Sequence, residues 1–506
     1  MDQHPVDLPD SVAQVARALV PGSARSHGAI SLWAEYAPHG SYRLALASDR
    51  PDDLAPFTGE AGAQAGLSLL RGPLDGPNLA ALRAALPNLA PVPLGTGTSA
   101  GFGDRLGLAT PGHVAALRAS HAEGRVAAVF AQQSMRENAR TGRTPQEVLD
   151  DATLGAFVAG WQHPVGADAD HLKTEADVDL CLAAGYTMFT IDPGDHVQDD
   201  ADTLADEALQ AAFEHRPPWA ALESSPSDLL QRLGTFELDL GERPLRFARG
   251  ELERAAVKYG AAVAHVARLT RHLRAQAGAE RAEVEVSVDE TATPTSLAEH
   301  AYLALEFDRL GVDWVSLAPR FVGAFEKGVD YIGDLAALAA DLDGHARVAA
   351  RLGGYKLSLH SGSDKFAVYP IAAAAAGGRV HLKTAGTSYL EALRVAGAVE
   401  PALLLEVMQL GLERFATDVK SYHISGRPEG VPDLRALPGS ALLALLEQRD
   451  ARQVLHVTFG SALQRYGERL RALLRAHEGA YRDALRRNFE RHLVPFVASA
   501  REEGTP

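Results

Sequence analysis

Short stretches that alternate apolar and polar residues recur downstream of residue 95, separated by longer segments with helical spacing. This rhythm is typical of parallel strand–helix units, in which a covering helix follows each strand. Eight such stretches occur, and eight strands close a barrel. They cover residues 98–103, 126–132, 170–174, 187–192, 284–289, 314–318, 356–360 and 380–384. We therefore expect an α/β fold organised as a (β/α)8 TIM-like barrel.

The segments around this pattern predict additions to the barrel. Residues 1–95 contain two alternating stretches joined by a turn, and a helical stretch near 79–86, so we expect an N-terminal α/β cap. Residues 96–400 would form the catalytic barrel, enlarged by a helical insertion near 200–280. Residues 401–506 are rich in Leu, Ala and Arg at helical spacing, which predicts a helical C-terminal extension.

One four-residue phrase occurs twice, as His171-Leu172-Lys173-Thr174 and as His381-Leu382-Lys383-Thr384. Side chains alternate between the two faces of a strand. Each copy would therefore place His and Lys on one face and Leu on the other. We predict that the Leu meets the outer helices, while the His and the Lys point into the mouth of the barrel.

Other predicted strands also carry polar residues at the end where barrel active sites are built. Asp192, Asp289 and His360 each stand at the end of a stretch with an apolar opposite face. Ordinary barrel interiors are filled with branched apolar side chains, and burying many unpaired charges is costly. The group as a whole therefore favours an active site.

Composition and charge narrow the class of protein. The chain is 46% hydrophobic and 23% charged, as in globular proteins, and its net charge of -16 argues against binding nucleic acid. The single cysteine, Cys181, excludes internal disulfides and a cysteine-based zinc site. Neither a signal segment nor an apolar run of membrane-spanning length is apparent, so we expect a soluble cytoplasmic protein without a membrane partner.

Three histidines without cysteine suit a borderline divalent metal cation such as Zn2+, Mn2+, Co2+ or Ni2+. We predict His171, His360 and His381 as its ligands. Asp289 or Glu290 could replace one of them, because alternation turns Asp289 inward and Glu290 stands at the strand end.

Further polar residues are candidates for binding a small molecule or moving a proton. Glu137, just after the second predicted strand, is a candidate proton acceptor. Cations that would give an acidic protein a local pocket for a carboxylate are Arg105, Lys173 and Lys383. Residues that would bind hydroxyls or a carboxylate from the loops after strands are Gln133, Asp192, Ser361, Asp364 and Lys365.

Six segments in the same order resemble the bacterial tagaturonate epimerases. They cover residues 101–113, 133–137, 169–174, 189–195, 360–366 and 381–384. The resemblance implies an isomerase of hexuronate breakdown that interconverts D-tagaturonate and D-fructuronate with a divalent metal. Related members also epimerise tagatose and fructose, so the implied partner is a small sugar acid or a ketohexose.

The reaction of that family constrains the mechanism we expect. The inverted carbon is β to the ketone, so removing a proton from the α carbon cannot invert it. We expect retro-aldol cleavage between these carbons, rotation of the aldehyde and re-addition. Glu137 would accept the hydroxyl proton and Asp289 or Glu290 would return it, or the reverse. Alternatives are transient oxidation by a nicotinamide, a metal-dependent aldolase that releases its fragments, and a catalytically silent sugar-acid binding protein.

Overall fold

The computed structural model of the protein describes residues 8–241, 244–278, 280–437 and 439–499. Its centre is a closed barrel of parallel strands in the order β12-β13-β14-β15-β6-β7-β8-β9. Their bounds are β6 (Ser99–Gly101), β7 (Ala127–Ser134), β8 (Val165–Leu172), β9 (Met188–Ile191), β12 (Glu283–Val288), β13 (Ser316–Pro319), β14 (Lys356–Leu359) and β15 (Val380–Lys383). Each overlaps one predicted stretch, which confirms the TIM-like barrel.

The prediction placed the start of one strand too late in the sequence. Strand β8 begins at Val165, five residues before the predicted start at Asp170. The part of β8 before Asp170 contains Gly166, Ala167 and Ala169, which are small residues with weak strand preference. The alternation of these small residues with carboxylates was therefore a weak signal in the sequence.

Helices cover the barrel and follow most strands directly. They are α3 (Thr110–Ala119), α4 (Met135–Thr141), α5 (Pro145–Val158), α6 (Glu175–Ala184), α9 (Arg249–Ala277), α10 (Leu297–Arg309), α11 (Leu335–Arg351), α12 (Tyr369–Ala375) and α13 (Thr387–Val399). Several begin with a reciprocal cap, as where Thr174 accepts from the Asp177 N–H and the Asp177 carboxylate accepts from Thr174. The first copy of the repeated phrase therefore ends as the N-cap of α6.

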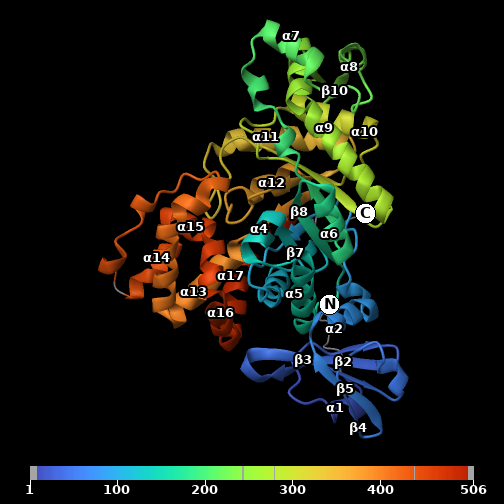
Figure 1. The fold of residues 1–506 in the computed structure, drawn as a ribbon, viewed down its shortest axis with the longest axis vertical. Helices are drawn as coiled ribbons and strands as arrows, with labels where there is room; N and C mark the ends of the chain where they lie inside the picture. Colours follow the sequence, from blue (N-terminus) through green and yellow to red (C-terminus); the bar gives the residue numbers. More distant parts are fainter. Residues whose placement is uncertain (1–7, 242–243, 279, 438, 500–506) are drawn as a thin grey trace.

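An antiparallel sheet forms the N-terminal part of the chain, at the bottom of Figure 1. Its order is β1-β2-β3-β5-β4, with β1 (Arg25–His27), β2 (Ile30–Ala37), β3 (Ser41–Ser48), β4 (Glu60–Gln64) and β5 (Leu67–Pro73). Helices α1 (Asp10–Ala13) and α2 (Gly76–Ala85) flank it. The predicted turn joins β2 to β3, whose pairing runs from Ser31↔Ala47 to Ala37↔Ser41.

A buried carboxylate organises the polar contacts of this sheet. Glu35 is fully buried and accepts hydrogen bonds from Arg43, Arg71 and the Trp33 indole. Burial alone would raise the pKa of Glu35, but Arg71, together with Arg43 and Trp33, holds it below its usual range. The carboxylate is therefore ionised in the folded state and matched by cations at the sheet surface.

Replacing Glu35 with alanine is expected to lower the free energy of unfolding by about 2–3 kcal/mol, because hydrogen bonds to a charged group are lost and Trp33 keeps a buried, unpaired N–H. Urea unfolding followed by intrinsic fluorescence would measure the change. Glu60→Ala is the matched control, since Glu60 lies exposed on β4 of the same sheet. Equal stability of the two variants would show that the Glu35 contacts contribute nothing.

A long excursion separates β9 from β12 and protrudes at the top of Figure 1. It contains α7 (Asp206–His215), α8 (Pro226–Leu233), a small hairpin of β10 (Glu237–Asp239) and β11 (Pro244–Arg246), and the 29-residue helix α9. Helices therefore dominate the range near residues 200–280, and the hairpin is an addition that the sequence pattern did not indicate.

The C-terminal extension is helical, as predicted, and lies to one side of the barrel (Figure 1, left). Its helices are α14 (Pro401–Asp418), α15 (Arg449–Val457), α16 (Phe459–Ala476) and α17 (Glu478–Ser499). Helix α17 packs against α3 and α13. The centroid of its Phe489 ring lies 5.5 Å from the ring centroid of Phe102, which follows β6, and 4.7 Å from that of His113 in α3. Among the described residues, none of the helices combines the length and apolar character needed to cross a bilayer.

Candidate active site

A buried lysine joins four strands inside the barrel. The Lys383 ammonium lies 2.6 Å from Asp170, 2.7 Å from Glu285 and 2.9 Å from Asp168, and donates to the Thr190 hydroxyl at 2.7 Å. All five side chains are buried. Burial opposes the charge of Lys383, but the carboxylates raise its pKa well above the usual value. The inward orientation that alternation predicted for Lys383 is therefore correct.

His381 also faces the barrel interior, but at a deeper level. It pairs with Ser358 in the ladder, two residues before His360 on the neighbouring strand. Its Nδ1 lies 2.8 Å from the Ser99 hydroxyl, its Nε2 lies 3.8 Å from Asp168, and burial lowers its pKa. The structure therefore does not bring His381 together with His171 and His360, because a two-residue step along a strand moves a side chain one layer down.

The first copy of the phrase departs from the predicted alternation. Asp168 and Asp170 face the interior, and the ladder between β8 and β9 then shifts between Ala169 and Leu172. His171 adopts a left-handed backbone with φ 56°, which turns its ring toward the mouth. The two interior carboxylates are residues that the sequence reasoning missed, although their alternation with Ala167 and Ala169 could have revealed them.

Lys173 lies beyond the end of β8 rather than inside the barrel. Its side chain is 43% exposed and pairs with Asp195 at 2.9 Å and Asp192 at 3.7 Å. The prediction that His171 and Lys173 share an inward strand face was wrong, because the strand ends at Leu172.

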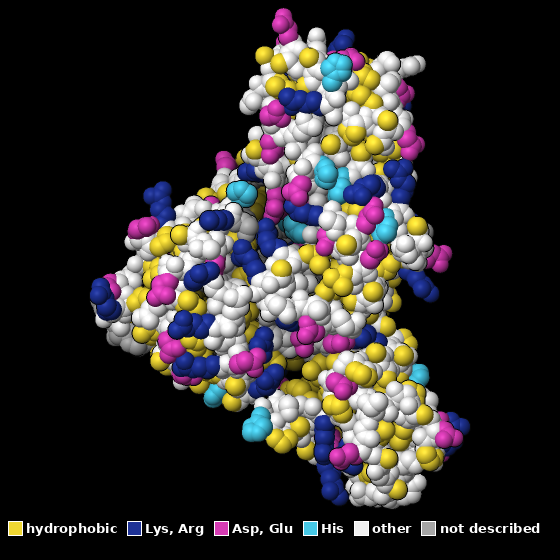
Figure 2. Space-filling model, in the orientation of Figure 1, with side chains coloured by type: hydrophobic (Ala, Val, Ile, Leu, Met, Phe, Trp, Pro, Cys, Tyr) yellow, Lys and Arg dark blue, Asp and Glu magenta, His cyan; other side chains and the backbone are white. Residues whose placement is uncertain are grey.

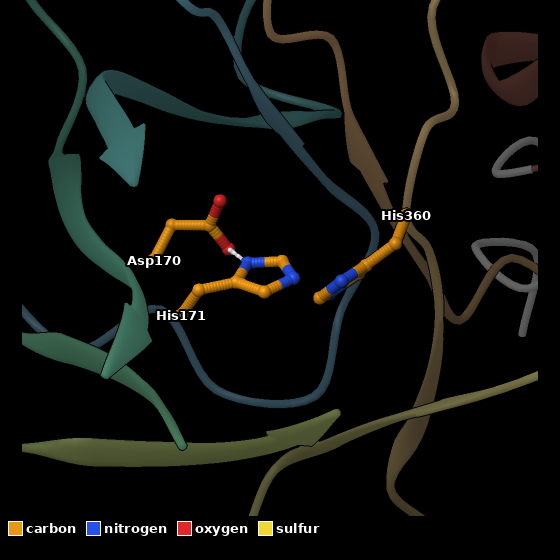
Figure 3. A group of neighbouring side chains, drawn as sticks. All are labelled: Asp170, His171 and His360. Carbon is orange, nitrogen blue, oxygen red and sulfur yellow. Dashed lines mark ion pairs between the residues drawn. The ribbon is translucent and has the colours of Figure 1, made fainter. Parts of the chain in front are cut away.

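Three side chains at the mouth have the chemistry of a metal site. Potential ligand atoms of Asp170, His171 and His360 all lie within 4.8 Å of one another. Figure 3 shows the His171 ring between the Asp170 carboxylate and His360, with the Asp170–His171 ion pair at 2.9 Å. Two imidazoles and one carboxylate fit a borderline divalent cation. Asp170 thus stands where His381 was expected.

Carboxylates surround His360 on its other sides. Its Nε2 lies 2.7 Å from Glu285 and its Nδ1 lies 3.3 Å from Asp289. Burial and Lys383 oppose protonation, but Asp289 and Glu285 raise the pKa of His360 to about 10. Such an imidazole is cationic without a metal, and metal binding would displace its proton.

Asp289 and Glu290 occupy different positions on one cavity of about 620 Å3. Asp289 is partly buried beside His360 and accepts a hydrogen bond from Ser287, and these contacts hold its pKa well below the usual value although burial opposes this. Glu290 is exposed and lies 3.5 Å from Arg136. Alternation thus correctly turned Asp289 toward the centre, and Glu290 lies on the cavity wall.

Glu137 is buried at the start of α4, where it forms a reciprocal cap with Ser134. The Arg105 guanidinium donates to it from Nε at 3.0 Å and from Nη2 at 2.5 Å. Burial would raise the pKa of Glu137, but Arg105 and then Lys327 lower it overall. Arg105 therefore forms a buried ion pair with Glu137. Its guanidinium also lies over the Phe459 ring, 3.6 Å from the ring centroid.

The turn after β14 divides the predicted binding residues. Ser361 lines the 620 Å3 cavity. Asp364 instead accepts from Arg452 at 3.0 Å, and the Lys365 ammonium donates to the carbonyls of Glu326, Val329 and Ser363. Left-handed backbones at Ser361 and Asp364 turn the chain here. Asp364 and Lys365 therefore hold loops in place and do not line this cavity.

Gln133 and Asp192 are both buried near the mouth. The Gln133 amide has no hydrogen-bond partner among the described residues, and the same is true of Gln132. Asp192 accepts from the Gly194 N–H at 2.8 Å, and burial raises its pKa. An unpaired buried amide at the end of a barrel strand is suited to a polar ligand.

Most cavity residues were missed by the sequence reasoning, and Arg136, Lys327 and Tyr422 are three of them. They come, in that order, from α4, from the loop after β13, and from the segment after α14. Arg136 adjoins Glu137 in a segment already singled out, so its position carried a signal. Lys327 and Tyr422 lie far from any alternating stretch, and only the packing of the extension brings them to the barrel.

Comparisons with known proteins agree with this architecture. The family model for tagaturonate epimerase matches residues 49–495. A tagaturonate/fructuronate epimerase of Thermotoga maritima is 43% identical over 418 residues, which is 82% of this chain and 84% of that protein. Two crystal structures of fructuronate-tagaturonate epimerase UxaE from Cohnella laeviribosi, a complex with one glycerol and the native form, cover 96% of this chain and 98% of theirs. They are 31% and 30% identical, with TM-scores of 0.88 and 0.87. The chain therefore belongs to the tagaturonate epimerase family of isomerases, as its motifs predicted.

Proposed function

We propose that the barrel mouth interconverts D-tagaturonate and D-fructuronate by metal-assisted retro-aldol and aldol steps, and that tagatose and fructose are secondary substrates. The observation that carries this proposal is the group of Asp170, His171 and His360 at the mouth, where His360 also lines a cavity of about 620 Å3. A cavity of this size suits a six-carbon sugar acid.

Asp170, His171 and His360 would hold the divalent cation, which is Zn2+, Mn2+, Co2+ or Ni2+. When bound, it would supply Lewis-acid stabilisation of the negative charge that develops on the ketone oxygen. Glu285 lies against Nε2 of His360 and Asp289 against Nδ1. One ring nitrogen would hold the cation, and the carboxylate beside the other nitrogen would orient the ring. Lys383 in turn fixes Asp170 and Glu285.

Carboxylates of the chain would transfer the proton of the β-hydroxyl group. Glu137 would accept that proton as the bond between the α and β carbons breaks, which leaves an aldehyde fragment and an enediolate fragment. After the aldehyde rotates, the enediolate carbon attacks its other face and the new alkoxide takes a proton from Asp289 or Glu290. The reverse assignment of the carboxylates is the second form of this proposal. Both fragments must stay in the cavity between the two steps.

Product analysis tests the proposed reaction. Incubation of the purified, metal-loaded enzyme with D-tagaturonate should yield D-fructuronate in the NMR spectrum, with no free aldehyde. A chelator should abolish turnover, and Mn2+ or Zn2+ should restore it. Accumulating aldehyde would identify an aldolase instead, and full activity after chelation would contradict the metal-assisted mechanism.

Replacing Glu137 with glutamine is expected to lower kcat by about 10²- to 10⁴-fold with little change in KM, because a proton acceptor is lost. Initial rates on D-tagaturonate measure the effect, with metal content and thermal unfolding as checks on integrity. Glu147→Gln is the matched control, since Glu147 caps α5 in the same way but is exposed. Near-normal turnover of the Glu137 variant would remove it from the mechanism.

A further inference from the structure

The cations near the barrel mouth differ in whether the protein itself neutralises them. Arg105 is committed to Glu137, Lys383 to three carboxylates and Lys173 to Asp195. These are the three residues that the sequence predicted as a pocket for a carboxylate. Each already has an acidic partner within 3.0 Å, so a cation without such a partner is better placed to bind a negatively charged substrate.

Lys327 is such a cation. It lines the 620 Å3 cavity, and its ammonium has no hydrogen bond or ion pair with another residue in the described part of the chain. Burial and the nearby Arg136 lower its pKa, while Glu137, Asp289 and Glu290 oppose this. An ammonium placed in a partly enclosed site without a partner is unfavourable unless a ligand completes it.

The backbone on both sides of Lys327 is held in place. The Lys365 ammonium donates to the carbonyls of Glu326 and Val329, and Arg452 donates to the carbonyl of Gly328 at 2.7 Å. Gln453 donates to the carbonyl of Lys327 itself at 3.1 Å. The buried Lys365 and helix α15 of the extension therefore fix the loop, so the position of Lys327 over the cavity is prepared in advance.

The cavity lining carries both cations and carboxylates. Its cations are Arg136, Arg320 and Lys327, and its carboxylates are Asp199, Asp289, Glu290 and Glu326. Arg136 lies 3.5 Å from Glu290, and its guanidinium lies 5.2 Å from the centroid of the Tyr422 ring. Figure 2 shows Lys and Arg side chains beside Asp and Glu at the hollow between the C-terminal helices and the barrel. A sugar acid could place its ketone near His360 and its carboxylate near Lys327 and Arg136, because all three residues line this cavity.

We propose that Lys327, supported by Arg136, binds the carboxylate of the sugar acid and sets the preference for uronates over neutral ketohexoses. This inference rests on the proposed function and adds a specificity-determining residue to it. Ketohexoses carry a hydroxymethyl group where the uronate has its carboxylate, so they gain nothing from this cation.

The test compares Lys327→Met with Lys420→Met, a control that removes an exposed lysine from the extension. In Lys327→Met the KM for D-tagaturonate should rise about 10- to 100-fold, as expected for losing a hydrogen bond between charged groups. The kcat and the metal content should stay within a few-fold of the wild-type values. Competitive inhibition by D-glycerate should weaken, while inhibition by glycerol should not, and Lys327→Arg should recover part of the KM.

The outcomes separate this inference from the proposed function. An unchanged KM, or a fall in kcat at constant KM, would overturn the role of Lys327 while the epimerase assignment stands. Calorimetric titration of the metal-loaded enzyme with D-tagaturonate needs no turnover. If the wild type bound but did not epimerise, and Lys327→Met bound more weakly, the proposed function would fail and the carboxylate site would survive.

Discussion

Replacing His360 with alanine is expected to remove the bound divalent metal and to lower epimerase activity by at least about 10³-fold, because Lewis-acid stabilisation is worth several kcal/mol. The variant loses one of the two imidazoles in the group formed with Asp170 and His171. It also leaves Glu285 and Asp289 without the ring that lies against both of them. Metal content after dialysis, measured by mass spectrometry, and initial rates on D-tagaturonate check both effects.

Two further variants make this result decisive. His215→Ala removes an exposed histidine at the end of α7 and should change neither quantity. His381→Asn keeps a hydrogen-bonding group next to Ser99 and should retain the metal, because His381 lies one layer below the proposed ligands. If His381→Asn lost the metal and His360→Ala kept it, the ligand set drawn from the structure would be wrong and the one predicted from sequence would be right.

The barrel itself could be predicted because its strands follow a period of two with a consistent apolar face. Val284, Val286 and Val288 are buried, and Glu285 between them reaches His360 and Lys383 at the centre. The same reasoning placed Lys383 and Asp289 inward. Such regularity is a local property, so a single sequence is enough to reveal it.

The site was harder to predict wherever the backbone departs from that period. The ring of His171 points toward the mouth because His171 has a left-handed backbone and the ladder shifts beside it. Alternation predicted the same orientation, but it is not the cause. Asp364 and Lys365 follow another left-handed residue and point to loops instead. Lys327 is held at the cavity by contacts of its loop with α15, which lies more than a hundred residues away in sequence. Contacts of this kind depend on tertiary packing, which the pattern of one strand does not encode.

Replacing Lys383 with methionine is expected to lower the free energy of unfolding by about 3–5 kcal/mol, the usual result of leaving buried charges without their counter-ion. Asp168, Asp170 and Glu285 would then face one another in the barrel with no cation among them. Repulsion should also displace Asp170 from His171, so metal affinity and turnover should fall together. Urea unfolding, metal analysis and initial rates measure the three effects.

The repeated phrase supplies the control for this variant. Lys173→Met removes the matching lysine of the other copy, whose exposed pair with Asp195 should contribute less than about 1 kcal/mol to stability. The same four residues thus produce an internal counter-ion in one strand and a surface pair in the other, because β15 ends at the lysine while β8 ends before it. Equal destabilisation by the two variants would contradict this, since it would mean that the three carboxylates around Lys383 tolerate the loss of their shared cation.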